Sequence, residues 1–405
     1  MSVDLGAVNI FSRDHKRDPF PFYARLRAQT PAARITAPVL GELWLITRYA
    51  DVVECLKDAE RFVKDPRNAG AKYRKTMPPW LPASIRSLEQ NMLDTDDPAH
   101  RRMRALVNQA FSPRRVDMLS DRIEAIARDL LAGMERNAAP DLLRDFALPL
   151  PLTVICELLG VPKADRRKFH KWSTKIMGAT SDLKMLLKLP SLFAIVGYLR
   201  RMCRARRERP RDDLVTALVE AGEDGDRLSE HELIAMILLL MIAGHETTVN
   251  LIASGTLALL EHPEQKLRLL ENPALLGSAI NELLRFTAPV EIATERYAVQ
   301  DTEIGGVPIR RGDLVLAVIA SANRDERVFT APDRLDLSRD PNPHVAFGDG
   351  IHYCLGHQLA RLEAETAFTC LFERFPNLQL AKPAEELLWR ETPIVRGLAA
   401  LPVTY

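Results

Sequence analysis

The chain has 405 residues, with 55 Lys and Arg against 54 Asp and Glu, and 47% of its residues are hydrophobic. These proportions are those of an ordinary globular protein, and they exclude a disordered, collagen-like or disulfide-rich chain. The near-zero net charge argues against nucleic acid as the main partner, because phosphate binding requires a basic excess.

The cysteines and the N-terminal sequence indicate where the protein works. Five cysteines are scattered without a Cys-x-x-Cys pair, which is typical of a reducing compartment. The first twenty residues lack a basic segment followed by an apolar one, so no secretion signal is expected. The longest apolar run, residues 233–243, is too short for a membrane span, which needs about 20 residues. We expect a cytoplasmic protein with no membrane partner.

The chain shows no internal repeat, low-complexity tract or Gly/Ser linker, so a single domain over residues 1–405 is predicted. In six segments, apolar residues recur at the three-and-four spacing of a helix. These predicted helices are 101–111, 116–134, 214–220, 230–261, 274–286 and 355–375. The strand-like segments are 43–46, 307–309 and 314–319. The fold is therefore predicted to be mainly α with a minor β part.

Segment 230–261 predicts one long helix through the core. Ser229 and Glu232 form a capping box at its start, and Pro263 follows its end. At 1.5 Å per residue it would be about 45–50 Å long. The polar residues 244–248 interrupt its apolar centre, where Gly and β-branched Thr lower helix propensity. Two interpretations stay open here, a polar patch facing a water pocket and a functional groove.

The segment 347–356, FGDGIHYCLG, places a lone cysteine among three glycines and just before an amphipathic helix. Glycines permit a tight turn, and the helix N-terminus stabilises a thiolate at Cys354. Three interpretations compete: a buried core thiol, a zinc site with His344, His352 and His357, and a thiolate ligand to haem iron.

The same ten residues match, position for position, the haem-binding signature Phe-Gly-x-Gly-x-His-x-Cys-x-Gly of the cytochrome P-450 superfamily, so the chain resembles that family. Other segments resemble further family motifs in the expected order. They are the oxygen-activating stretch 243–248, the Glu-x-x-Arg motif 282–285, and the segments 323–325 and 332–334. The likeness covers nearly the whole chain and implies the soluble bacterial type, a monomer with haem buried between the long helix and the cysteine loop.

The resemblance implies a heme b cofactor with Cys354 as the axial iron ligand and four basic residues at its propionates. His100 and Arg104 lie four apart and so share one helix face. Arg296 and His352 match two further propionate partners of the family. Any one of these bases alone would be interpreted as an ordinary solvated side chain.

The Glu-x-x-Arg motif implies a structural network. Glu282 and Arg285 are expected to join Arg334 in a buried cluster that holds the haem loop. The chain departs from the family pattern at Leu335, where Phe is usual, and at Glu326, where Pro is usual. Both changes affect packing, and neither removes a chemical group.

The resemblance implies a monooxygenase that inserts one oxygen atom from O₂ into a hydrophobic small molecule. Thr247 is expected to handle oxygen and Glu246 to relay protons. A ferredoxin or flavodoxin with its reductase is expected to supply electrons, because 405 residues leave no room for a fused reductase. Correspondence with the family places these residues at the substrate pocket: Trp80, Met92, Leu239, Ala243, Ile292 and Ile394.

Several reactions and substrates stay open. Family analogy favours tailoring of a polyketide or macrolide, with fatty-acyl or steroid hydroxylation as alternatives. Desaturation and oxidative coupling on the same fold are further alternatives. A non-catalytic haem protein would need no acid–alcohol pair, so Glu246 and Thr247 argue against it.

Overall fold

The computed structural model describes residues 3–38, 40–71, 81–111, 113–177, 189–222 and 226–405. Its contacts divide the chain into two compact units, each assembled from separate stretches of sequence. The first unit comprises residues 1–73, 120–150 and 247–405, and the second comprises 74–119 and 151–246. The single domain over 1–405 stays a prediction.

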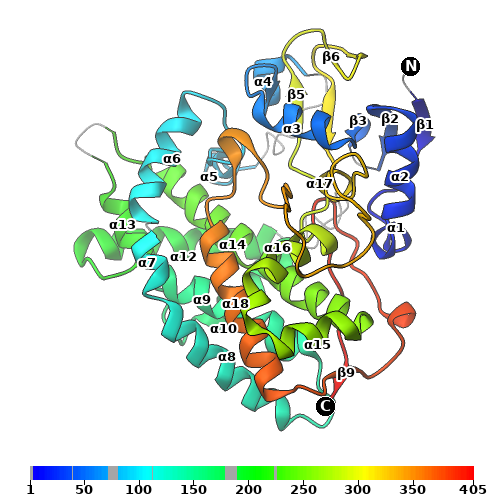
Figure 1. The fold of residues 1–405 in the computed structure, drawn as a ribbon. Helices are drawn as coiled ribbons and strands as arrows, with labels where there is room; N and C mark the ends of the chain where they lie inside the picture. The colour runs from blue at the N-terminus through cyan, green and yellow to red at the C-terminus, as the bar shows by residue number, and fades with distance from the viewer. Residues whose placement is uncertain (1–2, 39, 72–80, 112, 178–188, 223–225) are drawn as a thin grey trace. The chain divides into compact units, whose positions relative to one another are not determined.

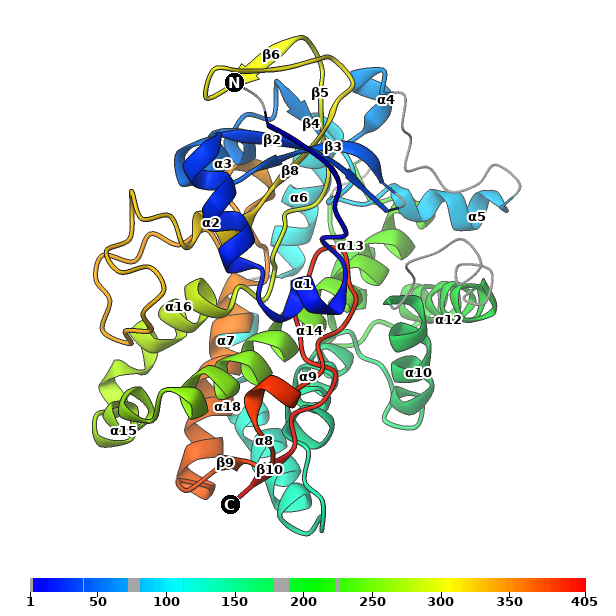
Figure 2. The same ribbon diagram turned by 90° about the vertical axis from the view of Figure 1, so that its right-hand side faces the viewer.

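The first unit contains a six-stranded mixed sheet in the order β1-β2-β3-β8-β5-β4 (Figure 2). Its strands are β1 (Val3–Ala7), β2 (Ala32–Ala37), β3 (Gly41–Ile46), β4 (Phe62–Val63), β5 (Arg296–Ala298) and β8 (Leu314–Ala317). Strand β3 pairs antiparallel with β2 and parallel with β8, where Trp44 lies opposite Val315. The sheet thus joins segments that lie about 270 residues apart in sequence.

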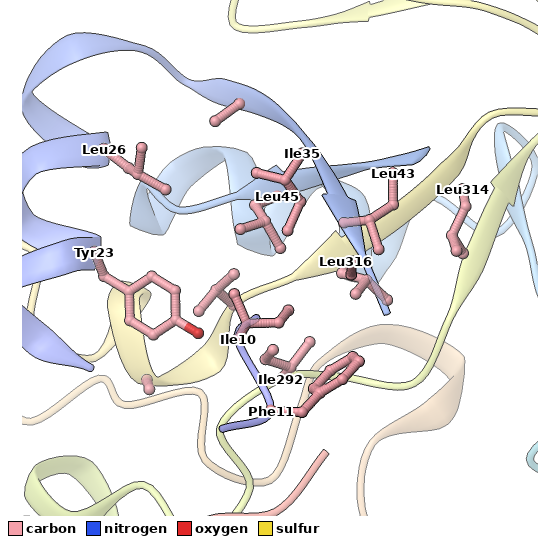
Figure 3. Packing of buried hydrophobic residues seen from close by; sticks show 14 of the residues in the cluster. Ile10, Phe11, Tyr23, Leu26, Ile35, Leu43, Leu45, Ile292, Leu314 and Leu316 are labelled. Carbon is pink, nitrogen blue, oxygen red and sulfur yellow. The ribbon is translucent and has the colours of Figure 1, made fainter. Parts of the chain in front are cut away.

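Both faces of this sheet are buried, and alternation along β3 shows why. Leu43 and Leu45 belong to one apolar cluster, while Trp44 and Ile46 belong to another on the opposite face. Helix α2 (Phe20–Gln29) contributes Tyr23 and Leu26 to the first cluster (Figure 3). Helix α3 (Tyr49–Lys57) contributes Val52 and Cys55 to the second.

The remaining elements of the first unit are mostly helical, and they include α18 (His357–Arg374) and the second half of the long helix α14 (Glu230–Glu261), from residue 247 onward (Figure 1). The others are α1 (Arg13–Arg17), α4 (Pro66–Ala69), α8 (Ser120–Glu135), η2 (Leu143–Ala147), α15 (Pro263–Glu271), η3 (Pro273–Leu275), α16 (Leu276–Thr287), α17 (Ile319–Ala322), η4 (Gly350–His352), η5 (Ala384–Glu386), β6 (Thr302–Ile304), β7 (Val307–Ile309), β9 (Gln379–Leu380) and β10 (Val403–Thr404). Helix α18 packs on α8 and α16. A Cβ added at Gly255 of α14 would lie 2.8 Å from the Phe368 ring of α18, so this glycine allows a close approach of the two helices.

The second unit is helical in its described residues. It holds α5 (Ala83–Arg86), η1 (Ser87–Glu89), α6 (Ala99–Ala110), α7 (Pro113–Asp117), α10 (Arg166–Met177), α12 (Leu189–Glu208) and α13 (Leu214–Glu220), while α9 (Pro149–Leu158) begins at its edge. Helix α12 packs against α10 and α13, and α13 packs against α6. The buried Arg206 donates to Asp213 at 2.5 Å, which links α12 to the N-cap of α13.

Helix α14 runs without interruption over the predicted bounds. The Ser229 backbone donates to the Glu232 carboxylate at 2.8 Å, and the Glu232 backbone donates to the Ser229 hydroxyl at 3.3 Å, which confirms the capping box. The helix is long and apolar enough to cross a membrane, but 61% of its most apolar window is buried inside the protein. That burial is typical of a core helix.

The other predicted helices and strands are present with shifts of a few residues at their ends. The helix expected at 116–134 is two helices, α7 and α8, and that expected at 355–375 begins at His357 after the cysteine turn. The mainly α prediction with a minor β part is confirmed.

Candidate active site

The loop before α18 has the backbone that its glycines predict. Gly348 and Gly350 have positive φ angles of 73° and 68°. A Cβ at Gly350 would lie 2.5 Å from the Leu56 carbonyl oxygen, so no larger residue fits there. The Cys354 backbone N–H donates to the Phe347 carbonyl at 2.9 Å and closes the turn. The loop therefore fixes Cys354 three residues before the first residue of α18.

Cys354 differs from the other cysteines in its surroundings. It is partly exposed, whereas Cys55, Cys156, Cys203 and Cys370 are buried, and none of the five is in a disulfide. Burial raises the pKa of Cys55 to about 11 and that of Cys156 and Cys203 to about 12, which keeps these three protonated. The exposed thiol in the glycine turn is therefore the one placed to act as a ligand.

The zinc interpretation finds no support. Within the described ranges, no three His, Cys, Asp or Glu side chains gather in a group that could hold a metal ion. His344 Nε2 lies 3.2 Å from Asn281 Oδ1, and burial, aided by Arg361, lowers the pKa of His344 to about 4. His357 Nδ1 lies 3.1 Å from the Cys354 carbonyl oxygen. A group that needs a single protein ligand fits this loop better.

Two of the predicted propionate partners lie in the first unit. Arg296 begins β5, is buried, and donates from Nη1 to the Thr294 carbonyl at 3.2 Å. His352 ends the η4 turn, two residues before Cys354, and is partly exposed. The sheet thus positions the arginine, and the glycine turn positions the histidine.

The other two predicted partners lie on α6 in the second unit, on one face of that helix. His100 is buried, and its Nδ1 lies 3.4 Å from the Asp97 carboxylate. Burial lowers the pKa of His100, and the Arg104 cation lowers it further. Arg104 is partly exposed one turn further along the helix.

The polar stretch of α14 forms a partly exposed stripe on a buried helix. Leu239, Glu246 and Thr247 are partly exposed and Ala243 is exposed, at the three-and-four spacing of one face. His245 faces elsewhere, because it is buried with Nδ1 2.6 Å from the Met241 carbonyl oxygen. A Cβ at Gly244 would lie 3.2 Å from the end of the Ile155 side chain of α9, which would have to shift slightly to admit it. The stripe is thus the accessible face of this stretch of α14.

The predicted pocket residues differ in their exposure. Trp80 lies outside the described residues. Met92 is 8% exposed, and Ile292 is 1% exposed within the apolar cluster of the sheet (Figure 3). Ile394 is partly exposed. Of these three, only Ile394 presents a clear apolar surface.

The Glu-x-x-Arg network exists, but its third member is not the predicted one. Glu282 and Arg285 are fully buried and joined by two hydrogen bonds of 2.7 and 2.8 Å. The second cation on Glu282 is Arg339, whose Nε lies 3.1 Å from both carboxylate oxygens. The prediction of Arg334 was wrong, because its side chain is exposed and only its carbonyl accepts, from Arg285 at 3.3 Å and Arg339 at 3.1 Å.

Two buried acids were not predicted as site residues. Glu291 is fully buried and binds Lys16 and Tyr23. Glu363 on α18 is 1% exposed next to Thr248 of α14. The helical spacing of α18 places Glu363 on its apolar face, which is the signal that could have identified it.

The family model described as Cytochrome P450 matches residues 38–392, which includes the glycine turn, α14 and the Glu-x-x-Arg network. The chain belongs to the cytochrome P450 family. It is 44% identical over 397 residues to the Vitamin D(3) 25-hydroxylase of Pseudonocardia autotrophica, covering 98% of this chain and 96% of that protein. It is 43% identical to the cytochrome P450 monooxygenase PikC of Streptomyces venezuelae, covering 100% and 94%.

A solved P450 structure shows the same fold. The Bacillus subtilis 168 bacillaene polyketide synthase cytochrome P450 PksS superposes with a TM-score of 0.90 at 40% identity, over 98% of this chain and 99% of that one. This P450 is therefore a monooxygenase of a family that binds heme b, O₂ and a hydrophobic substrate. Within the first unit, the single thiol of the glycine turn and the basic residues of β5 and η4 are of the chemical types that such a cofactor requires.

Proposed function

We propose that this P450 hydroxylates a polyketide- or macrolide-type molecule in the cytoplasm, with electrons from a ferredoxin or flavodoxin and its reductase. Among its relatives, PksS is a cytochrome P450 of polyketide biosynthesis, and PikC is a cytochrome P450 monooxygenase. The observation that carries the proposal is the partly exposed Cys354 in the glycine turn before α18.

Cys354 is the ligand, and the backbone supplies its environment. When heme b is bound, it supplies the redox chemistry that transfers one oxygen atom from O₂ to the substrate. The turn and the N-terminus of α18 favour a thiolate at Cys354. In the first unit, Arg296 and His352 would be cationic or hydrogen-bonding partners for propionates, and by the family resemblance His100 and Arg104 of the second unit are proposed for the same role.

Glu246 and Thr247 form the acid–alcohol pair. Both side chains are partly exposed on α14, so Glu246 can exchange its proton with solvent. The Thr247 hydroxyl, one residue further, can accept a proton or donate a hydrogen bond towards oxygen. The pair therefore delivers protons at a fixed position of a rigid helix. Leu239 and Ala243, on the same face of α14, are its proposed apolar neighbours, and Ile394 and the buried Ile292 are the proposed pocket residues of the first unit.

The ligand assignment is tested with Cys354→Ala and, as a matched control, Cys370→Ala. We expect the reduced protein with carbon monoxide to show the red-shifted Soret band of thiolate-bound haem, and Cys354→Ala to lose it. Cys370→Ala, which removes a buried thiol of α18, should keep it. Survival of the band in a folded Cys354→Ala variant would contradict the assignment.

The acid–alcohol pair is tested with Thr247→Ala, with Thr248→Ala as the adjacent control. Under a surrogate ferredoxin system, Thr247→Ala should keep consuming NADPH while hydrogen peroxide release rises about tenfold or more. The buried Thr248 should matter less for coupling. Equal coupling in wild type and Thr247→Ala would remove Thr247 from the proton path. A spectral titration with polyketides, steroids and fatty acids then tests the substrate class.

A further inference from the structure

Glu291 lies in a buried polar cluster that the monooxygenase chemistry does not require. Its Oε2 accepts from Lys16 Nζ at 2.7 Å, and both side chains are fully buried. Its Oε1 accepts from the Tyr23 hydroxyl at 2.6 Å and lies 3.3 Å from His15 Nε2. Three residues of the N-terminal region thus converge on one carboxylate that is about 270 residues away in sequence.

The charge on Glu291 depends on its neighbours. Burial alone would raise the pKa of Glu291, but Lys16 and His15 lower it to about 2. Glu291 is therefore a carboxylate at physiological pH. A buried carboxylate that loses its cation is strongly unfavourable, so Glu291 has to remain beside Lys16.

The backbone of Glu291 fixes a second segment. The N–H groups of Glu291 and Ile292 both donate to the Ile394 carbonyl, at 2.9 and 3.1 Å. Val290 and Val395 form an isolated antiparallel bridge, and the Ala320 N–H donates to the Glu291 carbonyl at 3.0 Å. Glu291, which is bound by Lys16, is thus hydrogen-bonded through its backbone to the partly exposed Ile394.

Arg396 connects the segment of Ile394 to helix α1. It is buried and donates to the carbonyls of Lys16 at 2.8 Å, Arg17 at 2.9 Å and Thr287 at 3.2 Å. Its guanidinium lies 3.8 Å from the centre of the Trp389 ring. Helix α1 is therefore fixed to residues 394–396 through its backbone and to Glu291 through the Lys16 side chain.

We propose that Glu291 is a positioning residue for substrate fit, which sets the place of Ile292 and Ile394 through its buried contacts with Lys16 and Tyr23. This inference rests on the proposed function, because it takes the partly exposed Ile394 as a border of the substrate pocket, while Ile292 is buried in the apolar cluster of the sheet. Glu291 acts through the backbone of the two segments and makes no contact with substrate itself.

The test compares two azoles that bind haem iron but differ in size. Imidazole occupies the iron site alone, whereas 4-phenylimidazole also has to fit the apolar surroundings. In Lys16→Met and in Glu291→Gln, the Kd for 4-phenylimidazole should rise about tenfold relative to that for imidazole. Hydrogen exchange at the Glu291 and Ile292 amides should be faster in the same variants.

Two further variants guard against a general folding effect. The double variant Lys16→Met/Glu291→Gln removes both charges and should restore the ratio of the two Kd values to within about threefold of wild type. Tyr23→Phe removes one hydroxyl only, and should change the ratio in the same direction by a smaller factor. Glu42→Gln, in the exposed pair with Arg34, is the control and should leave the ratio unchanged.

The outcomes separate this inference from the proposed function. An unchanged ratio in haem-loaded Lys16→Met, Glu291→Gln and Tyr23→Phe would overturn the inference alone. A wild-type protein in which neither azole shifts the haem spectrum would overturn the proposed function and, with it, this inference.

Discussion

Glu363 shows how strongly a single residue can couple the fold to pH. The carboxyl group lies on the buried face of α18, and no described group lies in hydrogen-bonding geometry to either of its oxygens. Burial raises the pKa of Glu363 to about 8, against a smaller lowering by the nearby Thr248 hydroxyl. The side chain is therefore a neutral acid in the folded protein near pH 7.

The sign of the pH dependence follows from this raised pKa. An unfolded glutamate ionises near pH 4.5 and the folded one near pH 8, so the unfolded state loses its proton first and stability falls between these values. Glu363→Gln removes that loss. We expect wild type and variant to differ by less than about 1 kcal/mol at pH 5, and the variant to be more stable by roughly 4 kcal/mol at pH 8.

Denaturant unfolding of the haem-loaded protein at pH 5 and pH 8 measures this difference. Glu365→Gln, on a partly exposed face of the same helix, is the matched control and should show no such pH-dependent gain. If Glu363→Gln raises the free energy of unfolding by the same amount at pH 5 and pH 8, Glu363 does not change its protonation between these pH values.

Individual chemical groups could be predicted from the sequence where they belong to a local motif. The glycine turn around Cys354 and the pair Glu282 and Arg285 depend on residues within one loop or one helix turn, so local spacing suffices. Arg334 was predicted in place of Arg339. The two arginines lie five positions apart in an irregular segment, where no periodicity indicates which side chain turns inward.

At the scale of elements, the helices could be predicted and most of the sheet could not. Helix α14 has the predicted bounds because its capping box and its terminal His-Pro are local signals. Strands β4 and β5 have two and three residues, too few for a period-2 pattern. The order β1-β2-β3-β8-β5-β4 depends on pairings between distant segments, which no local pattern specifies.

Two glycines within helices should respond in opposite ways to substitution by alanine. A Cβ at Gly255 of α14 would meet Phe368 of α18 at 2.8 Å, whereas a Cβ at Gly133 of α8 meets nothing within 4 Å. Gly133→Ala should stabilise the protein by about 0.5–1 kcal/mol, because alanine favours the helix. Gly255→Ala should destabilise it by about 1–3 kcal/mol, because the Phe368 ring has to move.

Thermal unfolding of both variants in the same buffer measures the two changes in stability. The double variant Gly255→Ala/Phe368→Leu should recover part of the loss if the ring is the obstacle. A Gly255→Ala protein as stable as Gly133→Ala would mean that α14 and α18 do not approach as closely as this contact indicates.

At the scale of the whole molecule, a short relay connects α16 to the cysteine loop. Arg285 donates from Nη1 to the Asn323 carbonyl at 2.9 Å, and the Asn323 side chain accepts from the Val345 N–H at 2.8 Å. Val345 lies two residues before the glycine turn. The irregular segment between residues 323 and 346 thus takes its shape from a buried ionic centre on α16.

Arg339 and Arg334 allow this relay to be tested at one site. Arg339 is 10% exposed and is the second cation on Glu282 besides Arg285, whereas the Arg334 side chain is exposed. Arg339→Ala should cost about 3 kcal/mol, because Glu282 loses one of its two buried cations. Arg334→Ala should stay within about 0.5 kcal/mol of wild type, because its carbonyl remains.

The relay adds a second consequence, which concerns the cofactor. Residues 336–342 hold Glu282 through the Asp336 N–H at 3.0 Å, Arg339 Nε at 3.1 Å and Asn342 Nδ2 at 3.1 Å. Loss of the Arg339 contact weakens this support of the segment before the cysteine turn, so Arg339→Ala should be purified with less haem per chain than Arg334→Ala. The haem-to-protein absorbance ratio and the unfolding midpoint should fall together in the first variant only. Arg339→Ala could instead be less stable and still carry a full haem complement. That result would mean that Glu282 and its cations stabilise the fold but do not support the cysteine loop.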